Sequence, residues 1–174
     1  MLALLVAMLA ITATGCGGGD DEATSAEEWT DAFCTAALEW RTELERIGEE
    51  ARDVSSLSVD RIEELADEGN AATEDFVDEV QELGRPETAS GDQIELAADE
   101  LSNTVDRERA EIETAVEDIE GIPEAATAAG TVTASVGEMF AALGDTLETL
   151  GSSDADEELR AAFEESEVCD QLRA

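Results

Sequence analysis

Carboxylates are the reactive groups that this sequence supplies in greatest number. Asp and Glu account for 46 of the 174 residues, and some of them cluster, as in the run Glu63, Glu64, Asp67 and Glu68. Paired carboxylates can serve as general acid and general base. Such runs more commonly form the solvated face of a helix, so we interpret this one as surface rather than as a catalytic site.

A second group of acids follows the spacing of a calcium-binding loop. The first, third, fifth and twelfth positions of that loop would be Asp154, Asp156, Glu158 and Glu165. The sixth position is Leu159, where the loop requires Gly. We therefore predict no metal site and interpret these acids as residues near a helix N-terminus, where the helix dipole favours negative charge.

Several residue types on which enzymes depend are missing. The chain has no His, no Lys and no Tyr, and all nine basic residues are Arg. Without His there is no His-based triad and no Glu-x-x-His di-iron site. Without Lys there is neither a P-loop nor a Schiff base. We expect a protein that is not an enzyme and that holds no cofactor.

Cys16 follows a segment typical of an exported protein. The apolar run before it is too short to span a bilayer but suits the core of a signal peptide. The small residues up to Gly15 resemble a lipobox, the motif at which bacteria attach diacylglycerol to a cysteine and cleave before it. We predict a signal peptide over residues 1–15, a lipid on Cys16 and a Gly/Asp-rich flexible tether over residues 16–24. An ordinary secretory signal is the alternative, and the lack of a basic residue near Met1 leads us to expect a start codon further upstream.

Two cysteines remain once Cys16 is modified. An even number of cysteines in an exported protein favours a disulfide, here Cys34–Cys169. Two buried reduced thiols are the alternative, and no His is present to activate a catalytic thiol.

The rest of the chain has the periodicity of helices. Apolar residues recur every three or four positions, and no stretch alternates as a strand would. We predict five helices, over about 25–51, 58–83, 90–120 and 123–150 and after residue 153. Short connections between long helices make sequence neighbours antiparallel. The expected fold of residues 25–174 is therefore all-α, an up-down antiparallel bundle of four to five helices.

The disulfide leaves the direction of the last helix open. An antiparallel pairing of the first and last helices would match Trp40 with Phe163 and Leu44 with Leu159. A parallel pairing would match Phe33 with Val168 and Ala37 with Leu172. We favour the parallel pairing, because short connections constrain direction more than generic apolar matches do.

The predicted fourth helix is poor in charge and rich in glycine. Gly130, Gly137, Gly144 and Gly151 recur every seven residues. A glycine inside a helix costs about 1 kcal/mol relative to Ala, so a compensating interaction is expected. Close packing of helices along one seam is the first interpretation. A groove that receives a partner helix or an apolar ligand at Gly130, Gly137 and Gly144 is the second, and partial disorder near Gly130 is the third.

The net charge of −37 restricts the partners. Phosphates of nucleic acid would be repelled, and so would an anionic membrane surface under a flat-lying helix. The membrane partner that we expect is therefore reached through the lipid on Cys16.

Three features together resemble a group of bacterial proteins. They are the lipobox, the segment from Trp29 to Cys34 with the pattern Trp-x-x-x-Phe-Cys, and the late segment Ala162-Phe163 that closes at Cys169. The chain is similar to the small acidic helical lipoproteins of high-GC Gram-positive (actinobacterial) species, which are mostly uncharacterised. The resemblance implies a lipid anchor on the extracytoplasmic face of the cell membrane and transfers no active site.

The sequence favours a non-enzymatic domain at the cell envelope. Interaction with an envelope protein, or structural support, is the first expectation for its function. A binding module for a small apolar ligand or for divalent cations is the alternative. A deep apolar cavity beside the fourth helix would favour ligand binding, and an exposed apolar stripe would favour a protein partner.

Replacement of Cys16 tests the predicted anchor. Cys16→Ala removes the only atom to which the lipid would be attached, so the domain should move from the membrane fraction into the medium. Fractionation followed by immunoblotting measures this. A mutant that stays in the membrane fraction would refute the lipid anchor.

Overall fold

The computed structural model describes residues 24–53, 58–86, 88, 91–117, 119–152 and 156–173. Cys16, the predicted signal peptide and nearly all of the predicted tether lie outside these residues, as does Asp154. Four long helices and two short ones make up the described part: α1 (Ala26–Arg52), α2 (Val59–Leu83), α3 (Gly91–Glu117), α4 (Ile122–Leu150), α5 (Glu157–Glu165) and α6 (Glu167–Arg173).

Polar caps fix where the helices begin. The Ser25 hydroxyl accepts a hydrogen bond from the backbone N–H of Glu28 at 3.2 Å. At the start of α2, the Ser58 hydroxyl accepts one from the backbone N–H of Arg61 at 3.2 Å. Each cap satisfies one of the backbone donors that a helix leaves unpaired in its first turn. Pro123 lies in the first turn of α4, where its missing N–H costs nothing.

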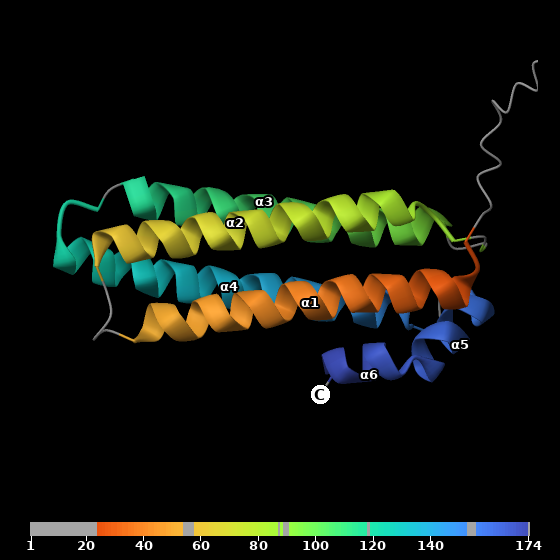
Figure 1. The fold of residues 1–174 in the computed structure, drawn as a ribbon. Helices are drawn as coiled ribbons and strands as arrows, with labels where there is room; N and C mark the ends of the chain where they lie inside the picture. Colours follow the sequence, from red (N-terminus) through yellow and green to blue (C-terminus); the bar gives the residue numbers. More distant parts are fainter. Residues whose placement is uncertain are drawn as a thin grey trace, which may run out of the picture.

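The four long helices run up, down, up and down in one bundle (Figure 1). α1 packs on α2, α3 packs most extensively on α4, and α1 also contacts α4. α2 and α3 meet over a smaller area. The predicted all-α up-down bundle is confirmed, with four helices in the bundle and the two short helices α5 and α6 packed on α1.

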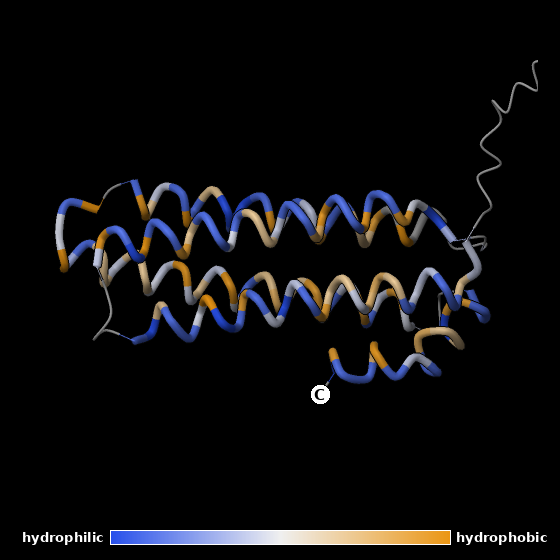
Figure 2. Tube along the Cα trace, in the orientation of Figure 1, coloured by the Kyte–Doolittle hydropathy of each residue, from blue (hydrophilic) through white to orange (hydrophobic). Residues whose placement is uncertain are grey.

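Each helix turns one hydrophobic face inward. Figure 2 shows hydrophobic residues recurring along every long helix between hydrophilic ones. Two stacked aromatic pairs lie in the core: Trp29 with Phe33, at a centroid distance of 5.3 Å, and Trp40 with Phe76, at 4.6 Å. Aromatic pairs of this kind add about 0.5–1.5 kcal/mol beyond their buried area.

The prediction of a single fifth helix is wrong, because this segment is divided at Ser166 into α5 and α6. The Ser166 hydroxyl donates to Asp31 at 2.7 Å and accepts from the N–H of Cys169 at 3.3 Å. Ser166 therefore caps α6 and ties it to α1. A serine that bonds locally in this way competes with helix continuation.

The last helices run parallel to α1, as the sequence analysis favoured. Phe163 contacts the rings of Trp29 and Phe33, and Leu172 accepts a hydrogen bond from Arg41 at 2.8 Å. Residues later in α1 therefore contact residues later in α5 and α6, as expected for parallel segments. Between them lies the predicted disulfide Cys34–Cys169, with its Cα atoms 5.1 Å apart and both residues fully buried.

Loss of the disulfide should destabilise the fold strongly. It joins residues 135 positions apart. Closing a loop of that length removes unfolded-state entropy worth roughly 4–5 kcal/mol. Cys34→Ala with Cys169→Ala should lower the free energy of unfolding, measured by denaturant titration, by about that amount and should loosen α5 and α6 first.

The matched control is reduction of the wild-type protein under mild denaturant, which should reproduce the effect. Equal stability of the oxidised protein and the double variant would contradict this account.

Candidate functional site

A cavity of about 170 Å³ lies inside the bundle at the end where α1 begins and α4 ends. All four long helices contribute to it. Its lining from α1 and α2 consists of Trp29, Phe33, Phe76, Val77, Val80 and Gln81. Its lining from α3 and α4 consists of Ile94, Ala98, Asp99, Leu101, Ser102, Val105, Thr146 and Leu150.

Aromatic rings form the wall of the cavity on the α1 side. Trp29 stacks on Phe33, and Phe163 of α5 meets both rings edge-on at 6.5 Å. The indole N–H of Trp29 donates to the carbonyl of Gly84 at 2.9 Å. Packing on one side and a hydrogen bond on the other hold Trp29 in one orientation.

Gly84 is needed for that hydrogen bond. It ends α2 with a φ of 61°, a backbone conformation that side chains with a Cβ rarely adopt. The turn directs its carbonyl back toward the start of α1. The close of α2 thereby positions a residue of the cavity wall.

The seam between α2 and α3 explains why space remains. These two helices pack less extensively than the α1–α2 and α3–α4 pairs. At this end α3 presents the small side chains of Ala98 and Ser102, one helical turn apart, to the cavity. Small residues opposite Val77 and Val80 leave a volume that a larger side chain would fill.

The lining changes from apolar to polar toward the solvent. Trp29, Phe33, Val105 and Leu150 are almost fully buried. Ser102 is half-buried, and Gln81 and Asp99 are exposed. No basic residue lines the cavity. The cavity therefore has an apolar interior and an uncharged or acidic rim, which is the usual arrangement of a small-molecule site.

The buried polar hydrogens of the lining are already used. The indole N–H of Trp29 is bound to Gly84, and the Thr146 hydroxyl donates to the carbonyl of Ala142 at 2.9 Å. Neither group is free to donate to an anion in the interior. An anion in the interior would therefore lack a hydrogen-bond donor, whereas an apolar group needs none.

Of the four glycines for which the sequence predicts a helix seam, only Gly151 is closely packed, since a Cβ added there would lie 3.9 Å from the Cβ of Phe163. Gly130, Gly137 and Gly144 are exposed, and a Cβ added to any of these three would meet nothing within 4 Å. They lie on the outer face of α4 with the exposed residues Ala134 and Ala141. Close packing inside the bundle is therefore not the reason for these three glycines, and the predicted groove for a partner remains a prediction.

Among the described residues, no group of three or more His, Cys, Asp or Glu side chains is arranged so that it could hold a metal ion. The side chain of Asp156 accepts from the N–H of Glu158 at 2.9 Å and so caps α5. The interpretation of these acids as helix N-terminal residues therefore holds for Asp156. From the carboxylate run of α2, Glu64 pairs with Arg61 at 3.0 Å.

A network of ion pairs joins α1 to α2 at the end opposite the cavity. Arg46 contacts Glu43, Glu50 and Glu68, and Arg61 contacts Glu50, Glu64 and Glu68. Hydrogen bonds from Arg46 lower the pKa of Glu43 and of Glu68, and those from Arg61 and then Arg46 lower the pKa of Glu50. Each of these four carboxylates contacts at least one of the two arginines. We therefore interpret the cluster as one that holds α1 and α2 together rather than as a binding site.

Two features of the inner helix faces were not predicted from the sequence. Glu108 is buried between Val105 and Ile112 on α3 and pairs with its neighbour Arg107 at 3.0 Å. Helical spacing places position 108 on the inner face, so its burial was foreseeable. The cavity was not, because it depends on which side chains face each other across the α2–α3 seam.

Comparison with known proteins adds no relative. No family model matches the chain, no curated protein is similar to it, and no solved structure resembles it at a significant level. Within the described part, none of the helices combines the length and apolar character needed to cross a bilayer.

The α1–α2 network should make stability depend on pH. A carboxylate whose pKa is lowered by folding stabilises the protein above its ordinary pKa of about 4.5, and that stabilisation is lost as pH falls through the lower folded value. Arg46→Gln should therefore lower the melting temperature by about 2–4 °C at neutral pH. The difference from wild type, measured by circular dichroism, should be smaller near pH 3 than at neutral pH, because pH 3 lies below the ordinary pKa of these carboxylates.

Arg160→Gln is the control, because its contact with Glu164 is a loose exposed pair at 3.9 Å. It should change the melting temperature little at either pH. An Arg46→Gln effect of equal size at both pH values would show that packing, and not charge, is responsible.

Proposed function

We propose that this protein is a membrane-anchored, extracytoplasmic binding protein whose helical domain is not an enzyme and holds a small apolar molecule. The cavity between α1, α2, α3 and α4 carries the proposal. Its apolar interior, its aromatic wall and its polar rim are the features by which small-molecule sites are usually recognised. The signal-like segment and Cys16 support the anchoring.

The size of the cavity limits what it can hold. An apolar cavity of about 150 Å³ in a protein core is large enough to bind benzene. The volume of about 170 Å³ therefore suits one ring or a short alkyl chain rather than a long acyl chain.

A protein partner is the second candidate function, and the outer face of α4 favours it. Between Thr127 and Gly144 the exposed positions of that face are mostly small, and Glu138 is the charged residue among them. In so acidic a chain, a surface of this kind lets another backbone approach closely. Cross-linking in cells from a photoreactive residue at position 134 would capture such a partner.

Binding of 2-phenylethanol, a neutral ring-sized probe, tests the cavity. The two tryptophans give two indole N–H signals in a nuclear magnetic resonance spectrum. The signal of Trp29, which lines the cavity, should shift with added probe, while that of Trp40, which donates to Thr73, should move less. The melting temperature should rise with probe concentration, because the probe binds the folded state.

Ala98→Phe should abolish both responses, because Ala98 is a half-buried residue of the cavity wall. Ala110→Phe is the matched control, since Ala110 is exposed on the same helix and should leave binding intact. Absence of any probe response in the wild-type protein, or an undiminished response in Ala98→Phe, would overturn the binding function.

A further inference from the structure

We propose that the cavity prefers small organic cations, with a ring or short alkyl group in the interior and an ammonium group at the rim beside Asp99. This inference rests on the proposed binding function and names its ligand class. The proposal concerns the charge of the ligand, which the size and polarity of the cavity interior do not determine.

The interior of the cavity accepts only the uncharged part of such a ligand. The donors of Trp29 and Thr146 are bound to Gly84 and Ala142, so an anion would find no partner in either. An ammonium group, with three donors, would find only the Thr146 oxygen as an acceptor among the buried side chains of the lining. A charged group deprived of hydrogen bonds in an apolar environment is strongly disfavoured. The charged end of a ligand must therefore remain at the rim.

The rim offers acceptors to that charged end. Asp99 contributes a carboxylate, and the neighbouring Gln81 and Ser102 contribute neutral oxygen atoms. Asp99 is exposed, and none of the ion pairs among the described residues involves it. An ammonium group can donate to these oxygens, whereas a carboxylate would face Asp99 as a like charge.

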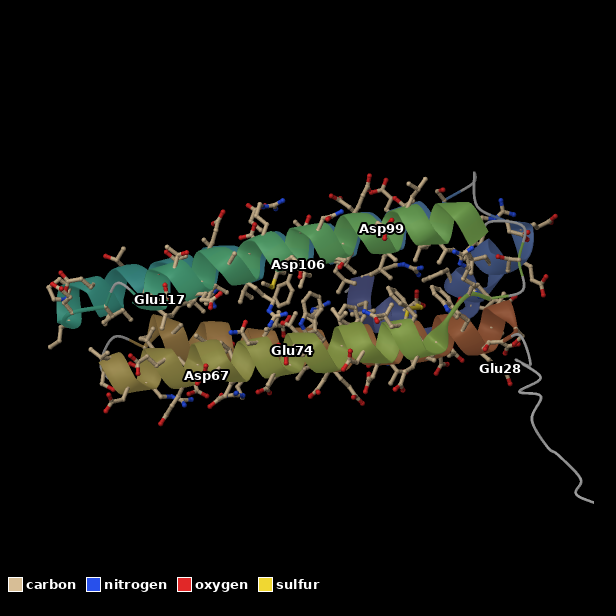
Figure 3. The ribbon with its side chains drawn as sticks, turned by 90° about the horizontal axis from the view of Figure 1, so that it is seen from above. Glu28, Asp67, Glu74, Asp99, Asp106 and Glu117 are labelled. Atoms are coloured by element: carbon tan, nitrogen blue, oxygen red, sulfur yellow. A yellow bond between two sulfur atoms is a disulfide. The ribbon has the colours of Figure 1, made fainter. Side chains whose placement is uncertain are left out.

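The surrounding surface acts in the same direction. Figure 3 looks down on α2 and α3 and labels acidic residues spread along both helices, including Glu74, Asp99 and Asp106. The whole chain carries a net charge of −37. A surface of one sign raises the local concentration of ligands of the opposite sign.

Three probes with the same ring separate charge from shape: 2-phenylethylammonium, 2-phenylethanol and phenylacetate. An exposed pair of charges contributes about 0.2–1 kcal/mol. The cation should therefore bind the wild-type protein up to about fivefold more tightly than the alcohol, and phenylacetate should bind most weakly. Affinities come from the shift of the Trp29 indole signal, which excludes cations attracted elsewhere on the surface.

Asp99→Asn should reduce the advantage of the cation over the alcohol to the smaller part that the remaining acidic surface contributes. Asp106→Asn is the matched control, because Asp106 is exposed on α3 outside the cavity and its loss should preserve the preference. The wild-type preference should also shrink as NaCl rises from about 0.05 M to about 0.5 M, since salt screens charges at an exposed rim.

The outcomes distinguish this inference from the binding function. Equal affinity of the wild-type protein for the cation and the alcohol overturns the preference and leaves the cavity as a binding site. A preference that is undiminished in Asp99→Asn overturns the role of Asp99. If none of the three probes shifts the Trp29 signal, the binding function fails, and the preference fails with it.

Discussion

Repulsion among carboxylates is the constraint on which the rest of this structure depends. With 46 acids and nine arginines, the outer faces of the helices repel one another, so the bundle must be held from inside and at its seams. Several of the arginines lie where elements meet. Arg46 joins α1 to α2, Arg109 reaches from α3 to Asn70 and Glu74 of α2, and Arg41 joins α1 to the carbonyl of Leu172.

The disulfide and the aromatic cluster form one unit with the cavity. Cys169 fixes α5 and α6 against α1, and Phe163 of α5 then packs on Trp29 and Phe33. Trp29 and Phe33 also line the cavity. The last helices of the chain thus support the cavity without lining it, and the loop of 135 residues is closed at the point where that support is required.

Local signals in the sequence predicted most of the fold. Ser25 and Ser58 accept hydrogen bonds at the helix starts where the sequence suggested, because an N-cap is decided within four residues. The disulfide and the parallel direction of the last helices followed from cysteine number and short connections. The break at Ser166 was not visible, because it depends on a hydrogen bond to Asp31, 135 positions away.

The candidate site was less predictable for the same reason. Ala98 and Ser102 look like ordinary small residues of an amphipathic helix until the helix opposite them is known. The glycines of α4 led to the opposite error, because the sequence suggested a packed surface where the structure has an exposed one. Gly137 and Gly144 were expected to pack closely, yet both face outward. Which faces meet is set by the whole bundle, whereas periodicity shows only that each helix has an inner face.

The position of the cavity in the bundle connects it to the proposed anchor. The predicted tether over residues 16–24 precedes α1, whose first two turns carry Trp29 and Phe33. A chain of nine residues spans at most about 30 Å when fully extended. With a lipid on Cys16, the cavity end of the bundle would stay within about that distance of the membrane, while the ion-pair network of Arg46 and Arg61 would lie at the far end. An acidic domain held in this way would concentrate small cations in the layer next to the membrane, which is where a rim carboxylate such as Asp99 would meet them.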